Sequence, residues 1–143
     1  MDLKLSPELD ALKSTMRRIV QEECIPLEPP YLANPTQEGI DECPLRGVSE
    51  SVMGVVGTLP NEDWARLTRV SKETGIYTAH VPTEYDGGGL GALGQVVIDE
   101  EAKRSIVPLP ISPVPMMLIG ACSPEQEKSH LWPTIRGDKY YAF

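Results

Sequence analysis

Three consecutive glycines at positions 87–89 form the pattern that most directly suggests chemistry in this sequence. They precede a predicted helix, and free N–H groups at a helix start attract anions such as phosphate. The spacing is not Gly-x-Gly-x-x-Gly, no lysine follows the glycines, and the acidic Asp86 stands directly before them. We therefore predict a turn here and keep a phosphate cradle as the weaker alternative.

Three carboxylates stand near apolar residues and could serve as a general acid or base: Glu84, Glu100 and Glu101. Their spacing does not pair them across a cleft, so we expect them on solvated helix faces. His80 and His130 have no acidic or thiol companion at the spacing of a metal site or a catalytic triad. The sequence thus predicts no catalytic residue and no metal site.

The three cysteines, Cys24, Cys43 and Cys122, are widely spaced, and they form neither a Cys-x-x-Cys pair nor a Cys/His cluster. An odd number of scattered cysteines does not build a disulfide framework. We expect reduced thiols that act as small core or loop residues, in a reducing compartment.

The stretch from Ile106 to Met117 is apolar and contains four prolines, at positions 108, 110, 113 and 115. Prolines at such intervals prevent regular hydrogen bonding, so we predict an extended segment. A segment of this kind is more often core than pocket, but proline-stiffened loops also line rigid grooves for apolar ligands. From the residues alone both interpretations stay open.

The first of the helices that must position these residues is predicted to start at Ser6-Pro7, with the serine as cap and the proline in the first turn. It should end near Cys24, because Pro26 cannot continue a helix. Residues 26–60 are rich in proline and glycine and should form an irregular insert, with a short helix as an option at 48–56.

A second helix should be capped by Asn61 and stop at Gly75. The third is predicted over residues 90–106, and the apolar residues expected to face inward are Leu93, Val96, Val97 and Ala102.

A short helix is expected over residues 116–121, and a last helix should begin with a capping box at Ser123 and end at Gly137. Pro133 should kink or shorten that helix. Residues 138–143 read as the start of a strand. The fold class we predict is all-α, a mostly antiparallel bundle of about five helices with long Pro/Gly-rich connections, in one domain over residues 1–143.

Composition excludes several classes of function. The 143 residues carry a net charge of -8 at pH 7, which repels nucleic acid and anionic lipid surfaces. No apolar run is long enough to span a bilayer, and the first ten residues lack the pattern of a signal peptide. We expect no nucleic-acid or membrane partner, and a cytoplasmic location, with the mitochondrial matrix as the alternative.

The order of motifs resembles the N-terminal half of the acyl-CoA dehydrogenases. The motifs are colinear and most distinct from residue 64 onward; they are Gly75-Ile76, Val81-Pro82-x-Glu84-Tyr85-x-Gly87-Gly88-Gly89-Leu90-Gly91, Asp99-Glu100-Glu101, Ser123-x-Glu125-Gln126-x-Lys128 and Trp132-Pro133-x-Ile135-x-Gly137-Asp138-Lys139. The proline-rich stretch after the Glu-Glu pair and the insert at 28–60 depart from the usual family pattern.

The resemblance implies a helical N-terminal domain that precedes a β-barrel and a C-terminal four-helix bundle, with FAD held between the latter two. Phe143 matches the position just before the family's flavin contacts begin, and the segments that hold most of the flavin site and the catalytic base have no counterpart here. We therefore expect no FAD bound by this chain alone. Carried over by position, the wall around the acyl chain would consist of Ile106, Val107, Leu109, Ile111 and Val114.

Two functional hypotheses follow from the resemblance. In the first, the chain is the N-terminal domain or a fragment of an acyl-CoA dehydrogenase, and it contributes domain packing and acyl-pocket wall. In the second, it is a non-catalytic helical interaction module or partner subunit. Both imply partners: the barrel and bundle in cis or in trans, acyl-CoA in the complete enzyme, and a homo- or hetero-oligomer.

Overall fold

Helix α1, Pro7–Ile19, begins as the sequence predicts. The computed structural model describes residues 4–33 and 59–139. The Ser6 hydroxyl oxygen accepts the N–H of Leu9 at 3.4 Å, and Pro7 occupies the first turn, where it needs no N–H. The helix buries one stripe at three-and-four spacing, formed by Leu9, Leu12, Met16 and Ile19.

The helical path does not end at Pro26, contrary to the prediction. A π turn, Val20–Cys24, and a 3-10 turn, Ile25–Leu27, carry the chain into α2, Glu28–Ala33. In the π turn the N–H of Ile25 reaches back to the carbonyl of Val20, and this wider turn lets the chain pass the proline. The first eight residues of the predicted irregular insert are therefore helical; its remainder up to residue 58, including the optional helix at 48–56, lies outside the described residues.

Helix α4, Asn61–Glu73, occupies the predicted place with one correction at its start. Asn61 is its first helical residue, and Pro60, with extended backbone, takes the cap position instead. The end is as predicted, because Gly75 follows with a left-handed backbone at φ 74°.

Helix α5, Gly91–Ala102, is shorter than predicted, since the chain turns after Ala102 toward the proline-rich segment. Val97 and Ile98 are buried, but Leu93 and Val96 are 65% and 60% exposed, so their predicted inward orientation is wrong. Apolar residues of the helix lie on more than one side, so periodicity alone could not decide which face packs inward.

The C-terminal helical path runs through α6, Pro124–Gln126, a π turn, Glu127–Leu131, and α7, Trp132–Arg136. The predicted capping box is present at Ser123, and Gly137 closes the path with φ 80°. Before it, residues 116–118 form a 3-10 turn where a longer helix was predicted. Of the predicted strand start at 138–143, residues 138 and 139 are described and form no strand, and residues 140–143 lie outside the described residues.

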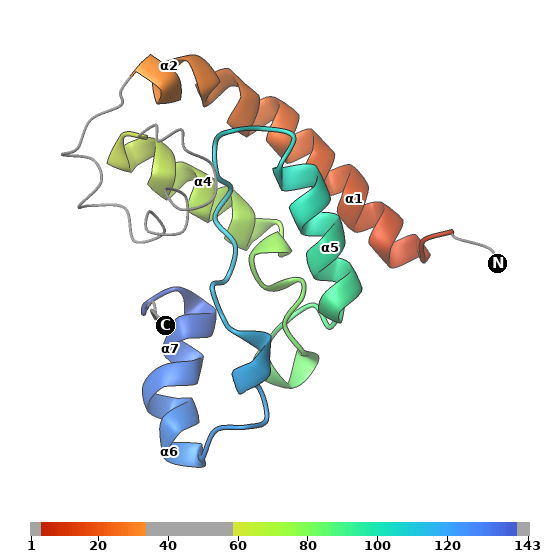
Figure 1. Cartoon of the computed structure of the whole chain (residues 1–143), viewed down its shortest axis with the longest axis vertical. Helices are drawn as coiled ribbons and strands as arrows, with labels where there is room; N and C mark the ends of the chain where they lie inside the picture. The colour runs from red at the N-terminus through yellow and green to blue at the C-terminus, as the bar shows by residue number, and fades with distance from the viewer. Residues whose placement is uncertain (1–3, 34–58, 140–143) are drawn as a thin grey trace.

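The all-α class is confirmed, since the described residues form helices and turns and no strand. They hold four continuous helical paths, where about five were predicted. Figure 1 shows α1 beside α5, with α4 next to them and α6–α7 at the other end of the molecule. The segment after α5 connects these two parts.

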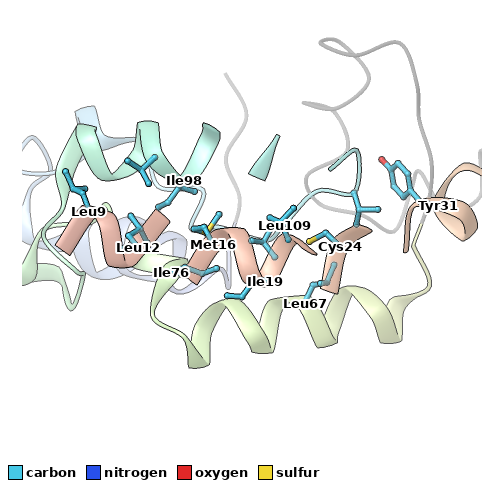
Figure 2. Packing of buried hydrophobic residues seen from close by; sticks show 14 residues of the cluster. Leu9, Leu12, Met16, Ile19, Cys24, Tyr31, Leu67, Ile76, Ile98 and Leu109 are labelled. Atoms are coloured by element: carbon cyan, nitrogen blue, oxygen red, sulfur yellow. The ribbon is translucent and has the colours of Figure 1, made fainter. Parts of the chain in front are cut away.

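Two hydrophobic clusters hold the elements together. In the larger, Met16 of α1, Leu67 of α4 and Ile98 of α5 are fully buried, and Figure 2 shows the row of α1 side chains lying between the other helices. Burial of each such side chain contributes about 1.5–3 kcal/mol. The smaller cluster packs the C-terminal helical path and consists of Val81, Val114, Leu131 and Ile135.

Candidate functional site

The glycine turn at 87–89 has no N–H groups left for a phosphate. The amides of Gly87, Gly88, Gly89 and Leu90 donate to the backbone carbonyls of residues 82, 78, 81 and 79, at 2.8 to 3.1 Å. A Cβ on Gly87 would lie 2.0 Å from the carbonyl oxygen of Val81, so only glycine allows this contact. The prediction of a turn is confirmed, and hydrogen bonds hold the turn against residues 78–82.

His80 belongs to the segment that the glycine turn packs against. Its side chain is 2% exposed, and its Nδ1 has no hydrogen-bond partner among the described residues. Burial lowers the pKa of His80, although the charge of Asp99 opposes this effect. The imidazole is therefore held neutral. Within residues 4–33 and 59–139, no group of three or more His, Cys, Asp and Glu side chains could hold a metal ion.

Glu101 corrects another prediction, because this side chain is fully buried and not on a solvated face. Arg17 of α1 donates two hydrogen bonds to it, Nη2 to Oε1 at 2.7 Å and Nε to Oε2 at 3.1 Å. Lys13 and Arg104 lie within 3.8 Å and 3.6 Å of the same carboxylate. The hydrogen bond from Arg17 lowers the pKa of Glu101, which stays charged and joins α1 to α5.

The described cysteines are free thiols, as predicted. Cys24 is buried in the larger cluster, and burial raises its pKa to about 11, so it is protonated and unreactive at neutral pH. Cys122 is half-buried against the smaller cluster. Cys43 lies outside the described residues.

The five predicted wall residues divide into two groups. Val107, Leu109 and Val114 are 0%, 6% and 6% exposed and pack into the two clusters of the domain itself. Ile106 is 38% exposed, and Ile111 is half-buried. These two are therefore the wall candidates with surface left for an external acyl group, and the wall itself stays a prediction.

Hydrogen bonds hold this segment at both ends. Ser112 donates its N–H to the carbonyl of Tyr77 at 2.8 Å and its hydroxyl to the carbonyl of Ile135 at 2.9 Å. At the other end the Ser105 hydroxyl donates to Glu28 of α2 at 2.8 Å. No local signal in the sequence predicts these anchors, because each joins residues more than twenty positions apart.

A second contact that sequence reasoning missed joins the glycine turn to the C-terminal helical path. The Tyr85 hydroxyl donates to Oε1 of Glu127 at 2.7 Å, which raises the pKa of Tyr85. Its ring packs at a tilt against Trp132, with centroids 5.5 Å apart. Glu84 and Glu100, the other two glutamates predicted to lie on solvated faces, are exposed as predicted.

The glycine turn does not offer a phosphate site for a cofactor. It was the candidate phosphate site that the sequence suggested, and its amides all donate hydrogen bonds to backbone carbonyls. Phe143 lies outside the described residues. No helix among the described residues has the length and apolar character needed to cross a membrane.

Comparison with known proteins agrees with the order of these elements. The family profile of the acyl-CoA dehydrogenase N-terminal domain matches residues 48–138. The (R)-benzylsuccinyl-CoA dehydrogenase of Thauera aromatica is 30% identical over 107 residues, which cover 75% of this chain and 23% of that protein. The chain thus spans less than a quarter of the length of this relative. No solved structure matches this chain significantly.

The profile covers the glycine turn, α4, α5, the proline-rich segment and the C-terminal helical path, which together form most of the described structure. This chain belongs to the acyl-CoA dehydrogenase family and contains the family's N-terminal domain.

Proposed function

We propose that this chain acts as the N-terminal domain of an FAD-dependent acyl-CoA dehydrogenase, whose complete form oxidises an acyl-CoA thioester between its α and β carbons. In that enzyme it supplies domain packing and part of the wall around the acyl group. The barrel and the C-terminal bundle, in cis or in trans, supply the flavin site and the catalytic base.

The observation that carries this proposal is the position of Ile106. It lies in the segment that the family resemblance assigns to the acyl wall, and its side chain is exposed while both sequence neighbours are buried. No charged side chain occurs between Arg104 and Glu125, so this surface suits an uncharged acyl group.

The test replaces Ile106 and Ile111 with alanine in the chain assembled with the flavin-binding and catalytic domains. Removing apolar surface from an acyl wall should change the ratio of kcat/KM for long against short acyl-CoA substrates roughly tenfold. The matched control is Ile25→Ala, which alters an isoleucine of similar exposure, 41%, on the first helical path. An unchanged ratio in the double variant would remove the wall from the proposal.

A second candidate is a non-catalytic helical interaction module or partner subunit, which the exposed Leu93 and Val96 favour. An absorbance scan of the purified chain with and without FAD separates the possibilities. Stoichiometric bound flavin in the chain alone would contradict our view that the flavin site lies elsewhere. If flavin binds and acyl-CoA is oxidised only after the barrel and bundle are added, the chain is a domain of the enzyme; assembly without oxidation would favour the module.

A further inference from the structure

Glu28, the first residue of α2, holds the start of the proline-rich segment. Its Oε1 accepts a hydrogen bond from the Ser105 hydroxyl at 2.8 Å and from the Ile106 N–H at 3.3 Å. The two partners lie 77 and 78 positions further along the chain. Helix α2 is thereby fixed to the segment that follows α5.

The contact with Glu28 extends one residue further through Ser105. The Ser105 hydroxyl oxygen also accepts the N–H of Val107 at 3.1 Å, and the N–H of Ser105 donates to the carbonyl of Ala102 at 3.3 Å. All three consecutive amides, 105 to 107, are therefore bound: the first by the Ala102 carbonyl, the second by the Glu28 carboxylate and the third by the Ser105 hydroxyl.

The chemistry of Glu28 suits this role. An ionised carboxylate is an acceptor with several lone-pair positions, so one oxygen can take two donors. None of the ion pairs among the described residues includes Glu28, and its carboxylate is held by two neutral donors. It is half-buried, which strengthens hydrogen bonds to its charge.

These hydrogen bonds determine how the side chain of Ile106 is placed. Ser105 and Val107 are 8% and 0% exposed, whereas Ile106 between them is 38% exposed, so anchoring the three amides fixes the direction of that side chain. We propose that Glu28 is a positioning residue that sets the place of Ile106 and, through it, the acyl-chain preference of the enzyme; the second part rests on the proposed function.

The first test measures hydrogen exchange of the Ile106 and Val107 amides in the 143-residue chain. Glu28→Ala should speed exchange at both amides by roughly tenfold or more, because it removes the charged acceptor of the Ile106 amide and frees the Ser105 hydroxyl that accepts the Val107 amide. Glu28→Gln keeps the Oε1 acceptor and should stay near the wild-type rate. Glu22→Ala is the matched control, since Glu22 is an exposed glutamate of the same helical path that pairs with Arg18.

The amide of Leu67 in α4 reports general loss of structure in the same samples. Unchanged exchange at Ile106 in Glu28→Ala, or an equal increase at Leu67, would overturn the positioning role.

The second test compares acyl-chain preference in the assembled enzyme. Glu28→Ala should shift the ratio of kcat/KM for long against short substrates in the same direction as Ile106→Ala, and Glu28→Gln should restore it. If Ile106→Ala shifts the ratio and Glu28→Ala does not, the inference about Glu28 fails and the wall stands. If Ile106→Ala itself has no effect, it is the proposed wall that fails.

Discussion

At the scale of single residues, Glu101 shows how one buried charge can connect two helices. Its carboxylate is fully buried, receives two hydrogen bonds from Arg17, and has two further cations nearby. A buried charge without partners would be costly, so these cations from α1 and from the end of α5 make the buried position tolerable. The pair thereby specifies which face of α5 meets α1.

Glu101→Gln should lower the free energy of unfolding at pH 7 by about 1–3 kcal/mol, with the lower end favoured because Arg17 is half exposed and solvent screens it. The folded-state pKa of Glu101 is lowered, so its contribution is present above about pH 4.5 and is lost as the pH falls through the lowered value. Urea titrations from pH 7 to pH 3 should show the variant and the wild type converging in acid. Glu100→Gln is the control, and an equal loss of stability there would contradict a special role for the buried carboxylate.

Residue identity alone did not reveal this site. Glu101 stands beside the exposed Glu100 in the sequence, and nothing local separates a buried glutamate from a solvated one. The deciding partner, Arg17, lies 84 positions earlier. Local signals did predict the caps at Ser6 and Ser123, because a cap depends only on the three or four residues that follow it.

At the scale of elements, both π turns end two residues before a proline. Ile25 precedes Pro26, Trp132 precedes Pro133, and each donates its N–H to the carbonyl five residues earlier. The widened turn lets the helical path continue where the sequence predicted a stop or a kink. Near Pro133 the carbonyl of Ser129, which proline cannot bond, accepts the Lys139 ammonium at 2.8 Å. Proline rules therefore predicted where the irregularity lies but not that the helix survives it.

The glycine turn allows an element-scale prediction. Gly87→Ala should destabilise the chain by about 2–4 kcal/mol, because its Cβ would lie 2.0 Å from the Val81 carbonyl oxygen and the backbone would have to move. Gly91→Ala is the control, since it has a positive φ of 55° but open space around the new Cβ, and it should cost only about 1 kcal/mol. Urea unfolding midpoints measure both variants. Equal unfolding midpoints for the two variants would mean that the close contact of Gly87 with Val81 does not stabilise the fold.

At the scale of the whole molecule, α5 has an apolar face that no described element covers, formed by Leu93 and Val96. The family resemblance implies partner domains that must pack against this one, but the apolar periodicity placed these two residues in the core. Both residues were misplaced for one reason: apolar residues lie on more than one side of α5, so the helix can be covered on more than one side.

The chain alone should therefore bind a hydrophobic dye or self-associate, and Leu93→Lys with Val96→Lys should reduce both properties severalfold. Dye fluorescence and analytical ultracentrifugation measure them. Met117→Lys is the control, because Met117 is 74% exposed on the separate 3-10 turn at 116–118. A chain that stays monomeric without dye binding would count against an exposed docking face.

The pairing of α1 with α5 also has a consequence for how the chain is made. Helix α1 leaves the ribosome before α5, and the helix that covers its apolar stripe ends only at Ala102. At ordinary rates of synthesis this leaves Met16 and its neighbours without α5 for roughly ten seconds. During that interval the apolar stripe of α1 is without its α5 partner, and a chaperone that recognises exposed apolar helices can bind it.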